Sequence, residues 1–513
     1  MNAVSPITVH TTAPECGIRR VRRETRKQRD HSLWVVDGLH GDKQYLSFSD
    51  CTANVITALK ERVFFHLVDG QFVAPTAPTA ESVRNTLTAF AHLVRRRAFS
   101  SVPVAIRDYH EAYRGPRKEV YRRAGERLAR EGMRRSFAYL GTFVKHEKIL
   151  NNPRKRAVPR VIQPRKPEYN VAVGRYIRHL EHPLYGIIDE ICGGPTVMKG
   201  YNVVDIGTHM ADAWRQFANP VAIGLDASRF DQHVSVPMLQ WEHSVYSLFY
   251  HGVERRKLMR LLALQLENIG FASCPDGTYK YTVHGCRASG DINTAMGNCL
   301  IMCALVYAYT RYAGVGKWRL LNNGDDCVVI VERSDLPKFA ALPQWFMTMG
   351  FVMTVEKPVF TLEEVEFCQM HPVFDGVTWR MVRNVRVVVS KDVTFLQRFA
   401  SEKHYSSYRY VLAQGGLALT GGLPIMQQFY QSIGHGACLF NMNHVDSRFL
   451  ESGFMHLTRG LSAKTRAISD IARVSFWRAF GLTPTEQRDW EDRVAGLPHL
   501  DSHVVGAADR LLL

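Results

Sequence analysis

The spacing of hydrophobic and polar positions predicts a chain that mixes α-helices with β-strands. Residues 83–140 carry apolar side chains at helical spacing, and residues 221–380 alternate between short apolar runs and longer helical patterns. Residues 381–513 have a mostly helical pattern with a glycine-rich break at 415–424. Together these patterns favour an α+β or α/β organisation.

Two short apolar runs near the N-terminus, LWVVDG and VFFHLVDG, are candidate strands, and the Pro/Ala-rich residues 74–82 are a candidate linker. The longest uncharged stretch runs from Ile292 to Thr310 and approaches the length that spans a bilayer. Because it contains Asn293, Asn298 and two tyrosines, we predict a buried helix there and no membrane anchor in this chain.

A polar segment, Asn322-Asn323-Gly324-Asp325-Asp326, separates two apolar runs. Such a pattern predicts a β-hairpin in which Gly324 supplies a turn position with positive φ. The hairpin would present two adjacent carboxylates at its tip. Clustered carboxylates repel each other unless a cation lies between them, so this arrangement suits Mg²⁺. A solvated Asp-rich turn is the alternative interpretation.

A longer apolar run, PVAIGL, leads into Asp226, roughly 100 residues upstream of the Asp pair. Its length suits a buried central strand with the carboxylate at its end, and Asp231 follows five residues later, past a turn. Alternatively, the strand simply leads into a helix that has an aspartate as its N-cap.

A third segment, from Ser289 to Asn298, lies between these two. Ser289-Gly290 predicts a loop that enters a helix, with Ser289 or Asp291 as the cap. Thr294 and Asn298 are four residues apart and would share one helix face, where buried polar groups need partners. Ribose hydroxyl groups are suitable partners, and internal hydrogen bonds are the alternative.

Composition and charge narrow the function classes. The chain has 513 residues, 46% hydrophobic and 22% charged, which predicts a globular protein with several domains or subdomains. A formal net charge of +17 attracts polyanions, of which nucleic acid is the commonest, although a basic protein can also bind acidic membranes. The ten cysteines form no C-x-x-C pair, which argues against a zinc ribbon, and Cys299 and Cys303 are predicted to be buried on one helix face.

In the order Asp-x₄-Asp, Ser-Gly-x₃-Thr-x₃-Asn and Gly-Asp-Asp, the three segments resemble motifs A, B and C of viral RNA polymerases. FVKHEKIL, GPTVMKGYN and GGLALTGGLP further resemble the tombusvirus-like family of plus-strand RNA viruses. The resemblance covers about residues 110–430 and does not obviously extend to 1–80 or to the last 70 residues. It implies template-directed RNA synthesis by a right-hand α+β fold, with an antiparallel palm sheet and a mostly helical thumb.

The same resemblance implies roles for the acidic residues and for one lysine. Asp226 and Asp325 would bridge two Mg²⁺ ions, with Mn²⁺ as an alternative metal, and Asp326 would be an auxiliary ligand. Lys357 resembles the lysine of motif D and would protonate the leaving pyrophosphate, although an exposed loop lysine is the commoner case.

Nucleotide binding is implied for two further sets of residues. Asp231, Ser289, Thr294 and Asn298 are similar to the set that senses the ribose 2′-hydroxyl, which can donate and accept hydrogen bonds. Lys145 and Arg160 match the basic motif F that holds the triphosphate, and Lys155 matches it less closely. General contact with the RNA backbone is the alternative for each of these cations.

The resemblance also implies a domain plan and partners. The expected parts are an N-terminal extension at 1–82 (a basic arm, flexible or in contact with RNA, plus a brace between fingers and thumb), fingers at 83–220, palm at 221–234, a fingers insertion at 235–285, palm at 286–380 and thumb at 381–513. Expected partners are the RNA template, the nascent strand, NTPs and a viral auxiliary replication protein. The protein would act in the host cell cytoplasm, recruited to membrane-bound replication complexes and touching membrane only indirectly.

Three other functions compete with this interpretation. Reverse transcriptases usually carry an aromatic residue where this chain has Asn323, and a bulky steric gate where it has Asp231. A basic RNA-binding or coat protein fits the charge but does not explain three acidic motifs. A P-loop NTPase is disfavoured, because Trp318 follows Gly314-Val315-Gly316-Lys317 where the motif needs a hydroxyl residue.

Overall fold

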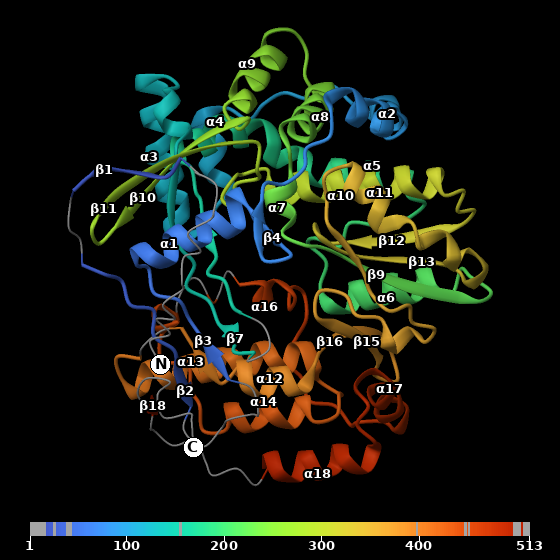
Figure 1. The fold of residues 1–513 in the computed structure, drawn as a ribbon. Helices are drawn as coiled ribbons and strands as arrows, with labels where there is room; N and C mark the ends of the chain where they lie inside the picture. The colour runs from blue at the N-terminus through green and yellow to red at the C-terminus, as the bar shows by residue number, and fades with distance from the viewer. Residues whose placement is uncertain are drawn as a thin grey trace.

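The computed structural model describes residues 17–23, 27–36, 44–152, 156–396, 399–445, 449, 452–495 and 504–505. The strands form a four-stranded sheet, a five-stranded sheet and several smaller ones. Figure 1 shows the four-stranded sheet on the right, the five-stranded sheet on the upper left and a group of C-terminal helices below. The mixture of helix and sheet that the hydrophobic pattern predicts is confirmed.

The four-stranded sheet contains, in spatial order, β12 (Trp318–Asn322), β13 (Asp326–Glu332), β9 (Pro220–Ala227) and β14 (Met353–Val355), and every neighbouring pair is antiparallel. The side chains of β9 alternate between two cores. Val221 and Ile223 pack in the core of helix α10 (Thr294–Tyr312), whereas Ala222 packs in the core of helix α6 (Val203–Trp214). Because both faces are covered, the strand is apolar up to Asp226, and the predicted buried central strand is confirmed.

The five-stranded sheet has the order β1 (Arg19–Arg22), β11 (Gly277–His284), β10 (Glu267–Cys274), β6 (Leu140–Val144) and β8 (Val161–Ile162). In this sheet β6 and β10 run parallel and the other neighbours run antiparallel. Strand β1 is exposed along its length and carries three arginines. This stretch of the basic N-terminal run is therefore an edge strand, and its charge discourages pairing with a further strand.

Helices surround α10 on its side of the four-stranded sheet. The helices that contribute to this core or pack beside it include α2 (Ala80–Arg97), α3 (Gly115–Glu131), α4 (Pro167–Ile177), α5 (Glu181–Ile191), α8 (Val236–Tyr246), α9 (Gly252–Ala263) and α11 (Leu342–Thr348). Helix α2 begins after Thr79, whose hydroxyl oxygen accepts a hydrogen bond from the Ser82 N–H at 3.1 Å. The linker predicted at 74–82 therefore ends at Thr79, because residues 80–82 belong to α2.

The N-terminal region confirms one predicted strand and shortens the other. LWVVDG contains β2 (Trp34–Val36), which pairs with β17 (Thr394–Phe395) and β18 (Val504–Val505). VFFHLVDG was expected to be one strand. Its centre does form β4 (His66–Val68), which pairs with β5 (Gln71–Val73), but its first two residues end the helical segment formed by α1 (Thr52–Leu59) and a π-helical turn, Lys60–Phe64. Val55, Leu59 and Val63 share its buried face at helical spacing, which the strand prediction overlooked.

The C-terminal region is mostly helical, as predicted. Its longer helices are α12 (Val385–Lys391), α13 (Glu402–Thr420), α14 (Met426–Gly434), α17 (Asp470–Phe480) and α18 (Pro484–Ala495). The expected break at 415–424 is wrong for its first half, because α13 continues through Gly415 and Gly416. A Cβ on Gly416 would lie 2.1 Å from the Tyr430 ring, so this glycine allows α14 to cross α13 closely. The chain leaves the helix at Gly421.

The uncharged stretch after Ile292 forms α10, most of which is buried, so the predicted buried helix is confirmed. Cys299 and Cys303 are both 0% exposed within it, as predicted. Across the described ranges, no helix combines the length and apolarity needed to cross a membrane.

Candidate active site

Three aspartates meet at one end of the four-stranded sheet. Strands β9 and β13 pair with Asp226 directly opposite Asp326, so these two residues are cross-strand neighbours. Asp325 precedes β13 in the turn that follows β12. Asp226 and Asp325 are exposed, and Asp326 is half-buried. The fold therefore brings together the aspartates that the sequence predicts as metal ligands, and their metal role stays a prediction.

The turn before Asp326 has the predicted hairpin geometry. Gly324 has φ +94°, the region that side-chain-bearing residues avoid. The Asn322 side chain holds Gly324 from both sides, accepting its N–H at 3.1 Å and donating to its carbonyl at 2.7 Å. The Asn323 N–H donates to the Asp326 carbonyl at 2.9 Å and closes the turn. The hairpin and its positive-φ glycine are confirmed.

The carboxylates of Asp226, Asp325 and Asp326 repel one another at this edge of the sheet. Burial raises the pKa of Asp326 to about 6, and Asp325 and Asp226 act in the same direction. The backbone N–H of Cys368 opposes the shift by donating to the Asp326 carboxylate at 3.0 Å. Within the described part of the chain, no three His, Cys, Asp or Glu side chains already lie where they could hold a metal ion. Carboxylate oxygens are the donors that Mg²⁺ prefers, so the three aspartates have the donor chemistry that this ion requires.

Asp231 and Asn298, which the sequence predicts as ribose-sensing residues, touch each other. Asp231 lies on the short helix α7 (Phe230–His233) and accepts a hydrogen bond from Asn298 Nδ2 at 2.8 Å. Burial raises the pKa of Asp231, while the Asn298 amide and Arg287 act against that rise. Asp325 raises the pKa of Asp231 further, which indicates that the Asp231–Asn298 pair and the aspartate cluster lie near each other.

The other two predicted ribose contacts are engaged internally. The Thr294 hydroxyl donates to the Ala288 carbonyl at 2.8 Å, and the Ser289 hydroxyl donates to the Val161 carbonyl at 3.4 Å. The expectation that Ser289 or Asp291 caps α10 is wrong, because no side chain caps this helix. Asp291 instead forms a buried ion pair with Arg165.

Two of the three predicted triphosphate cations share one counter-ion. Glu147 lies 3.0 Å from Lys145 Nζ and 3.4 Å from Arg160 Nη1. The backbone N–H of Lys145 also donates to the Arg160 carbonyl at 2.8 Å, which holds the two residues side by side. Lys155 lies outside the described residues. Arg160 also acts to lower the pKa of Asp231, so the Arg160 guanidinium lies within electrostatic range of the Asp231 carboxylate.

A sequence model of the viral RNA dependent RNA polymerase family matches residues 19–498. The chain belongs to this family. The predicted resemblance is confirmed, and it extends beyond residues 110–430 toward both ends of the chain.

Relatives within this polymerase family come from plant viruses. The chain is 40% identical over 481 residues to the RNA-directed RNA polymerase of Cucumber necrosis virus, an alignment that covers 93% of this chain and 57% of that protein. It is 41% identical over 470 residues to that of Cymbidium ringspot virus, covering 91% and 56%. Against that of Turnip crinkle virus the identity is 40% over 444 residues, covering 86% and 56%. The chain thus spans a little over half the length of these relatives.

Several charged residues near the polymerase motifs were not predicted. Glu147 pairs with both Lys145 and Arg160, and a buried pair of Arg287 with Glu242 lies behind Asn298. Lys199, from the GPTVMKGYN segment, donates to Asn323 Oδ1 at 2.9 Å beside the aspartate turn. Glu356 reaches toward β9, and burial together with Glu366 and Asp226 raises its pKa. None carries a local periodic pattern, although Lys199 lies in a segment that the resemblance includes.

Lys357, the residue that resembles the motif D lysine, is exposed in the loop after β14. Its neighbour Glu356 donates its backbone N–H to the Gly224 carbonyl at 2.9 Å, which fixes the start of this loop against β9. The lysine therefore follows a strand that borders the aspartate cluster, and its catalytic role stays a prediction.

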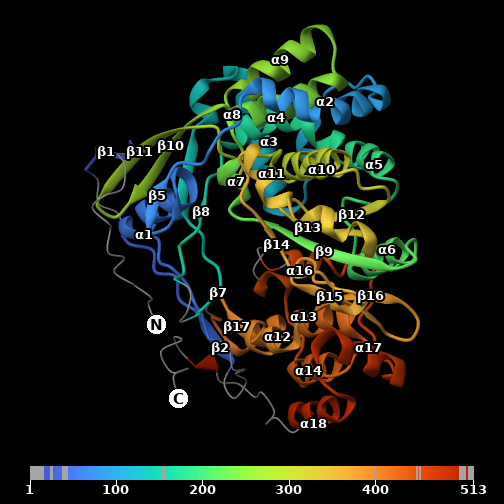
Figure 2. The same ribbon diagram turned by 45° about the vertical axis from the view of Figure 1, so that its right-hand side comes forward.

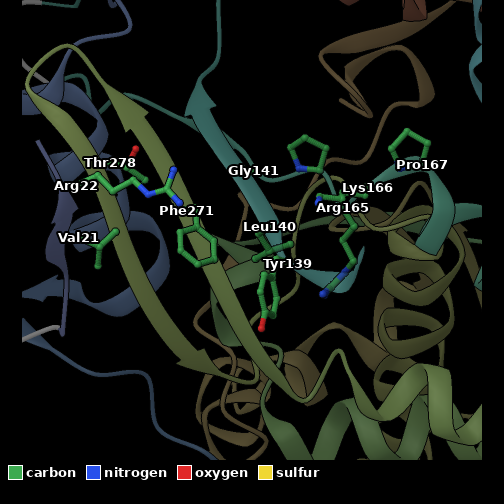
Figure 3. Close-up of a pocket in the computed structure, with 11 residues that line it drawn as sticks. Val21, Arg22, Tyr139, Leu140, Gly141, Arg165, Lys166, Pro167, Phe271 and Thr278 are labelled. Carbon is green, nitrogen blue, oxygen red and sulfur yellow. The ribbon is translucent and has the colours of Figure 1, made fainter. Parts of the chain in front are cut away.

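A cavity of about 570 Å³ lies beside the five-stranded sheet and away from the aspartates. It is lined by residues of β1, β6, β10, β11 and the loop at 164–167 (Figure 3). Tyr139 and Phe271 lie side by side in it, with ring centroids 5.6 Å apart. The predicted site residues do not line this cavity, so it is separate from the candidate active site.

Proposed function

We propose that this chain is the catalytic part of an RNA-directed RNA polymerase that replicates a plus-strand RNA genome. The observation that carries the proposal is the pairing of Asp226 with Asp326 across β9 and β13, with Asp325 in the adjoining turn. Membership of the viral polymerase family gives these aspartates their context. The reaction would be attack of the RNA 3′-hydroxyl on the α-phosphate of an NTP, with pyrophosphate leaving.

In the proposed mechanism, Asp226, Asp325 and Asp326 would hold two Mg²⁺ ions, with Asp326 as the auxiliary ligand. Bound there, the ions would activate the attacking oxygen and neutralise charge on the leaving group. Lys145 and Arg160 now pair with Glu147, and they would exchange this partner for the triphosphate when an NTP binds. Asp231 and Asn298 would receive the ribose, and Lys357 would protonate the pyrophosphate.

We infer the right-hand plan for the rest of the chain. The four-stranded sheet would be the palm, the five-stranded sheet with its neighbouring helices the fingers, and the C-terminal helices the thumb. The brace role of the N-terminal extension is supported by two pairings: β1 with β11 in the five-stranded sheet, and β2 with β17 among the C-terminal helices. Figure 2 shows β1 beside β11 at the five-stranded sheet and β2 beside β17 at the C-terminal helices.

The proposed partners are the RNA template, the nascent strand and the four NTPs. We also propose that a viral auxiliary replication protein recruits the chain to membrane-bound complexes in the host cell cytoplasm. Flotation of the purified chain with vesicles tests this recruitment. If the chain floats without the auxiliary protein, the indirect route is contradicted.

The direct test of the proposed function is incorporation of labelled NTP on a short RNA template with Mg²⁺. The expected result is template-dependent RNA extension that prefers NTPs to dNTPs. Preference for dNTPs would indicate a reverse transcriptase. RNA binding without incorporation, even when the auxiliary protein and membranes are supplied, would indicate a binding protein.

Arg160→Met is expected to raise the KM for all four NTPs by about 10–100-fold, because it removes a charged donor to the triphosphate. Steady-state kinetics on one template measure this effect. Arg123→Met is the matched control, since Arg123 is an exposed helical arginine paired with Glu119, and its KM should not change. Equal KM values for Arg160→Met and wild type would place Arg160 outside the triphosphate site.

Mg²⁺ is expected to raise the melting temperature more at pH 7.5 than at pH 5. The pKa of Asp326 is raised to about 6 in the folded chain, so the folded state binds this proton more tightly than the unfolded state. The stability that protonation contributes is complete below the ordinary pKa of about 4 and is lost as the pH rises through about 6. Above that pH, the ionised carboxylates repel each other until a cation binds.

Thermal melting of wild type and Asp326→Asn, with and without Mg²⁺, measures this linkage. The variant should melt higher than wild type at pH 7.5 without metal, and Mg²⁺ should shift it less. An identical Mg²⁺ shift at both pH values and in both proteins would contradict metal binding at this carboxylate.

A further inference from the structure

Behind the Asp231–Asn298 pair lies a fully buried ion pair that the mechanism above does not use. Arg287 and Glu242 have side chains that are 0% exposed, and their charged groups are in direct contact. Glu242 lies on α8, and Arg287 lies in the loop between β11 and α10. A buried ion pair of this kind contributes little net stability, because both charges lose their hydration. Its presence therefore calls for a role other than stability.

Arg287 determines which way the Asn298 amide faces. Arg287 Nε donates to Asn298 Oδ1 at 3.1 Å, while Asn298 Nδ2 donates to Asp231 at 2.8 Å. A guanidinium group can only donate, so the amide oxygen must face Arg287 and the amide nitrogen must face Asp231. If the amide turned over, its NH₂ group would face the guanidinium and its oxygen would face the carboxylate. Both contacts would then be lost.

Glu242 in turn determines the position of Arg287. Its carboxylate accepts from Arg287 through two guanidinium nitrogens, from the Tyr246 hydroxyl at 2.7 Å and from Asn293 Nδ2 at 2.9 Å. These contacts come from α8 and from the start of α10, so the arginine is held between two helices. A Cβ on Gly297 would lie 2.5 Å from both the guanidinium and the carboxylate, which explains why this turn of α10 carries a glycine.

We propose that Arg287 and Glu242 are positioning residues for sugar selection. This inference rests on the proposed function, because it assigns Asp231 and Asn298 to the ribose of an incoming NTP. The ion pair would hold the Asn298 amide in one orientation, and the amide would hold the Asp231 carboxylate ready to accept from the 2′-hydroxyl. A site that meets a hydroxyl with a fixed polar group discriminates strongly against a substrate that lacks it, since the group is then left unpaired.

The test is the ratio of kcat/KM for UTP to that for 2′-deoxy-UTP, measured by single-nucleotide extension on an RNA template. The variant is the double substitution Arg287→Met with Glu242→Gln. It removes both charges together, so no buried charge is left unpaired, and the glutamine oxygen can still accept from Tyr246 and Asn293. The ratio is expected to fall by about ten-fold or more, because the Asn298 amide loses its orientation.

The matched control is Arg165→Met with Asp291→Asn, which neutralises the second buried ion pair at the start of α10 in the same way. The hydrogen bonds of Arg165 go to Asp291, Asn268 and the Ala138 carbonyl, and none of them reaches Asn298 or Asp231. The control variant should prefer UTP over 2′-deoxy-UTP by the same ratio as wild type, even if its turnover is lower. The triple variant, which carries Asn298→Ala together with the Arg287 and Glu242 substitutions, should have the same UTP-to-2′-deoxy-UTP ratio as Asn298→Ala alone. The reason is that the ion pair acts on the ratio only through the Asn298 amide.

An active Arg287–Glu242 variant with the wild-type ratio would overturn the positioning role and leave the proposed function intact. A wild-type chain that incorporates neither nucleotide would overturn the proposed function itself. If circular dichroism shows that the double variant does not fold, Arg287→Lys keeps a positive charge opposite Glu242 but removes the guanidinium Nε that donates to Asn298. It should move the ratio in the same direction, and an unchanged ratio there would equally overturn the positioning role.

Discussion

Asp325→Asn is expected to reduce nucleotide incorporation by on the order of 10³-fold, with RNA binding unchanged. Asparagine keeps the size and the turn position of Asp325 but removes the negative charge that would bind Mg²⁺. The side chain is exposed in the hairpin turn, and the turn is held by Asn322 and Asn323, so the fold should not depend on its carboxylate. Primer extension and filter binding with the same RNA separate catalysis from binding.

Asp212→Asn is the matched control for this prediction, because Asp212 is an exposed helical aspartate paired with Arg215 at 2.9 Å and lies in another element. It should incorporate nucleotides at the wild-type rate. If Asp325→Asn also keeps the wild-type rate while Asp226→Asn loses it, Asp325 is not a metal ligand. If all three variants remain active, the catalytic site lies elsewhere in the chain.

Arg165→Met is expected to destabilise the fold by about 3–5 kcal/mol, the usual cost of leaving a buried charge unpaired. Arg165 is 1% exposed and pairs with Asp291, which is 3% exposed. Its guanidinium also donates to Asn268 Oδ1 and to the Ala138 carbonyl, both at 2.6 Å. These contacts join the loop after β8 to the segment before α10, so their loss should loosen the junction between these two segments.

Urea unfolding followed by tryptophan fluorescence measures this cost. Adding Asp291→Asn to Arg165→Met should recover much of the lost stability, since the buried carboxylate charge is removed as well. A single variant as stable as wild type would mean that Asp291 reaches solvent or another cation. A double variant less stable than the single one would mean that the carboxylate contributes through contacts other than this pair.

Much of the candidate site follows from local sequence patterns. The apolar run before Asp226 has the length and continuity of a strand buried on both faces, and β9 is such a strand. The Asn-Asn-Gly turn between apolar runs predicts the hairpin that carries Asp325. Local patterns failed where packing competes with them: Gly415 and Gly416 indicate a helix break, yet α13 continues because the closely crossing Tyr430 ring requires a glycine there.

The amino-acid sequence by itself determined the mixed fold, the strand and hairpin that carry the aspartates, and the family to which the chain belongs. Each depends on spacing within one short segment or on the order of such segments. The tertiary structure alone decided that Asp226 faces Asp326, that Glu147 joins Lys145 to Arg160, and that Arg287 and Glu242 meet behind Asn298. These contacts join residues that lie far apart in the chain or within irregular loops. Local periodicity cannot predict them, because the packing of whole helices and sheets determines the distances between these residues.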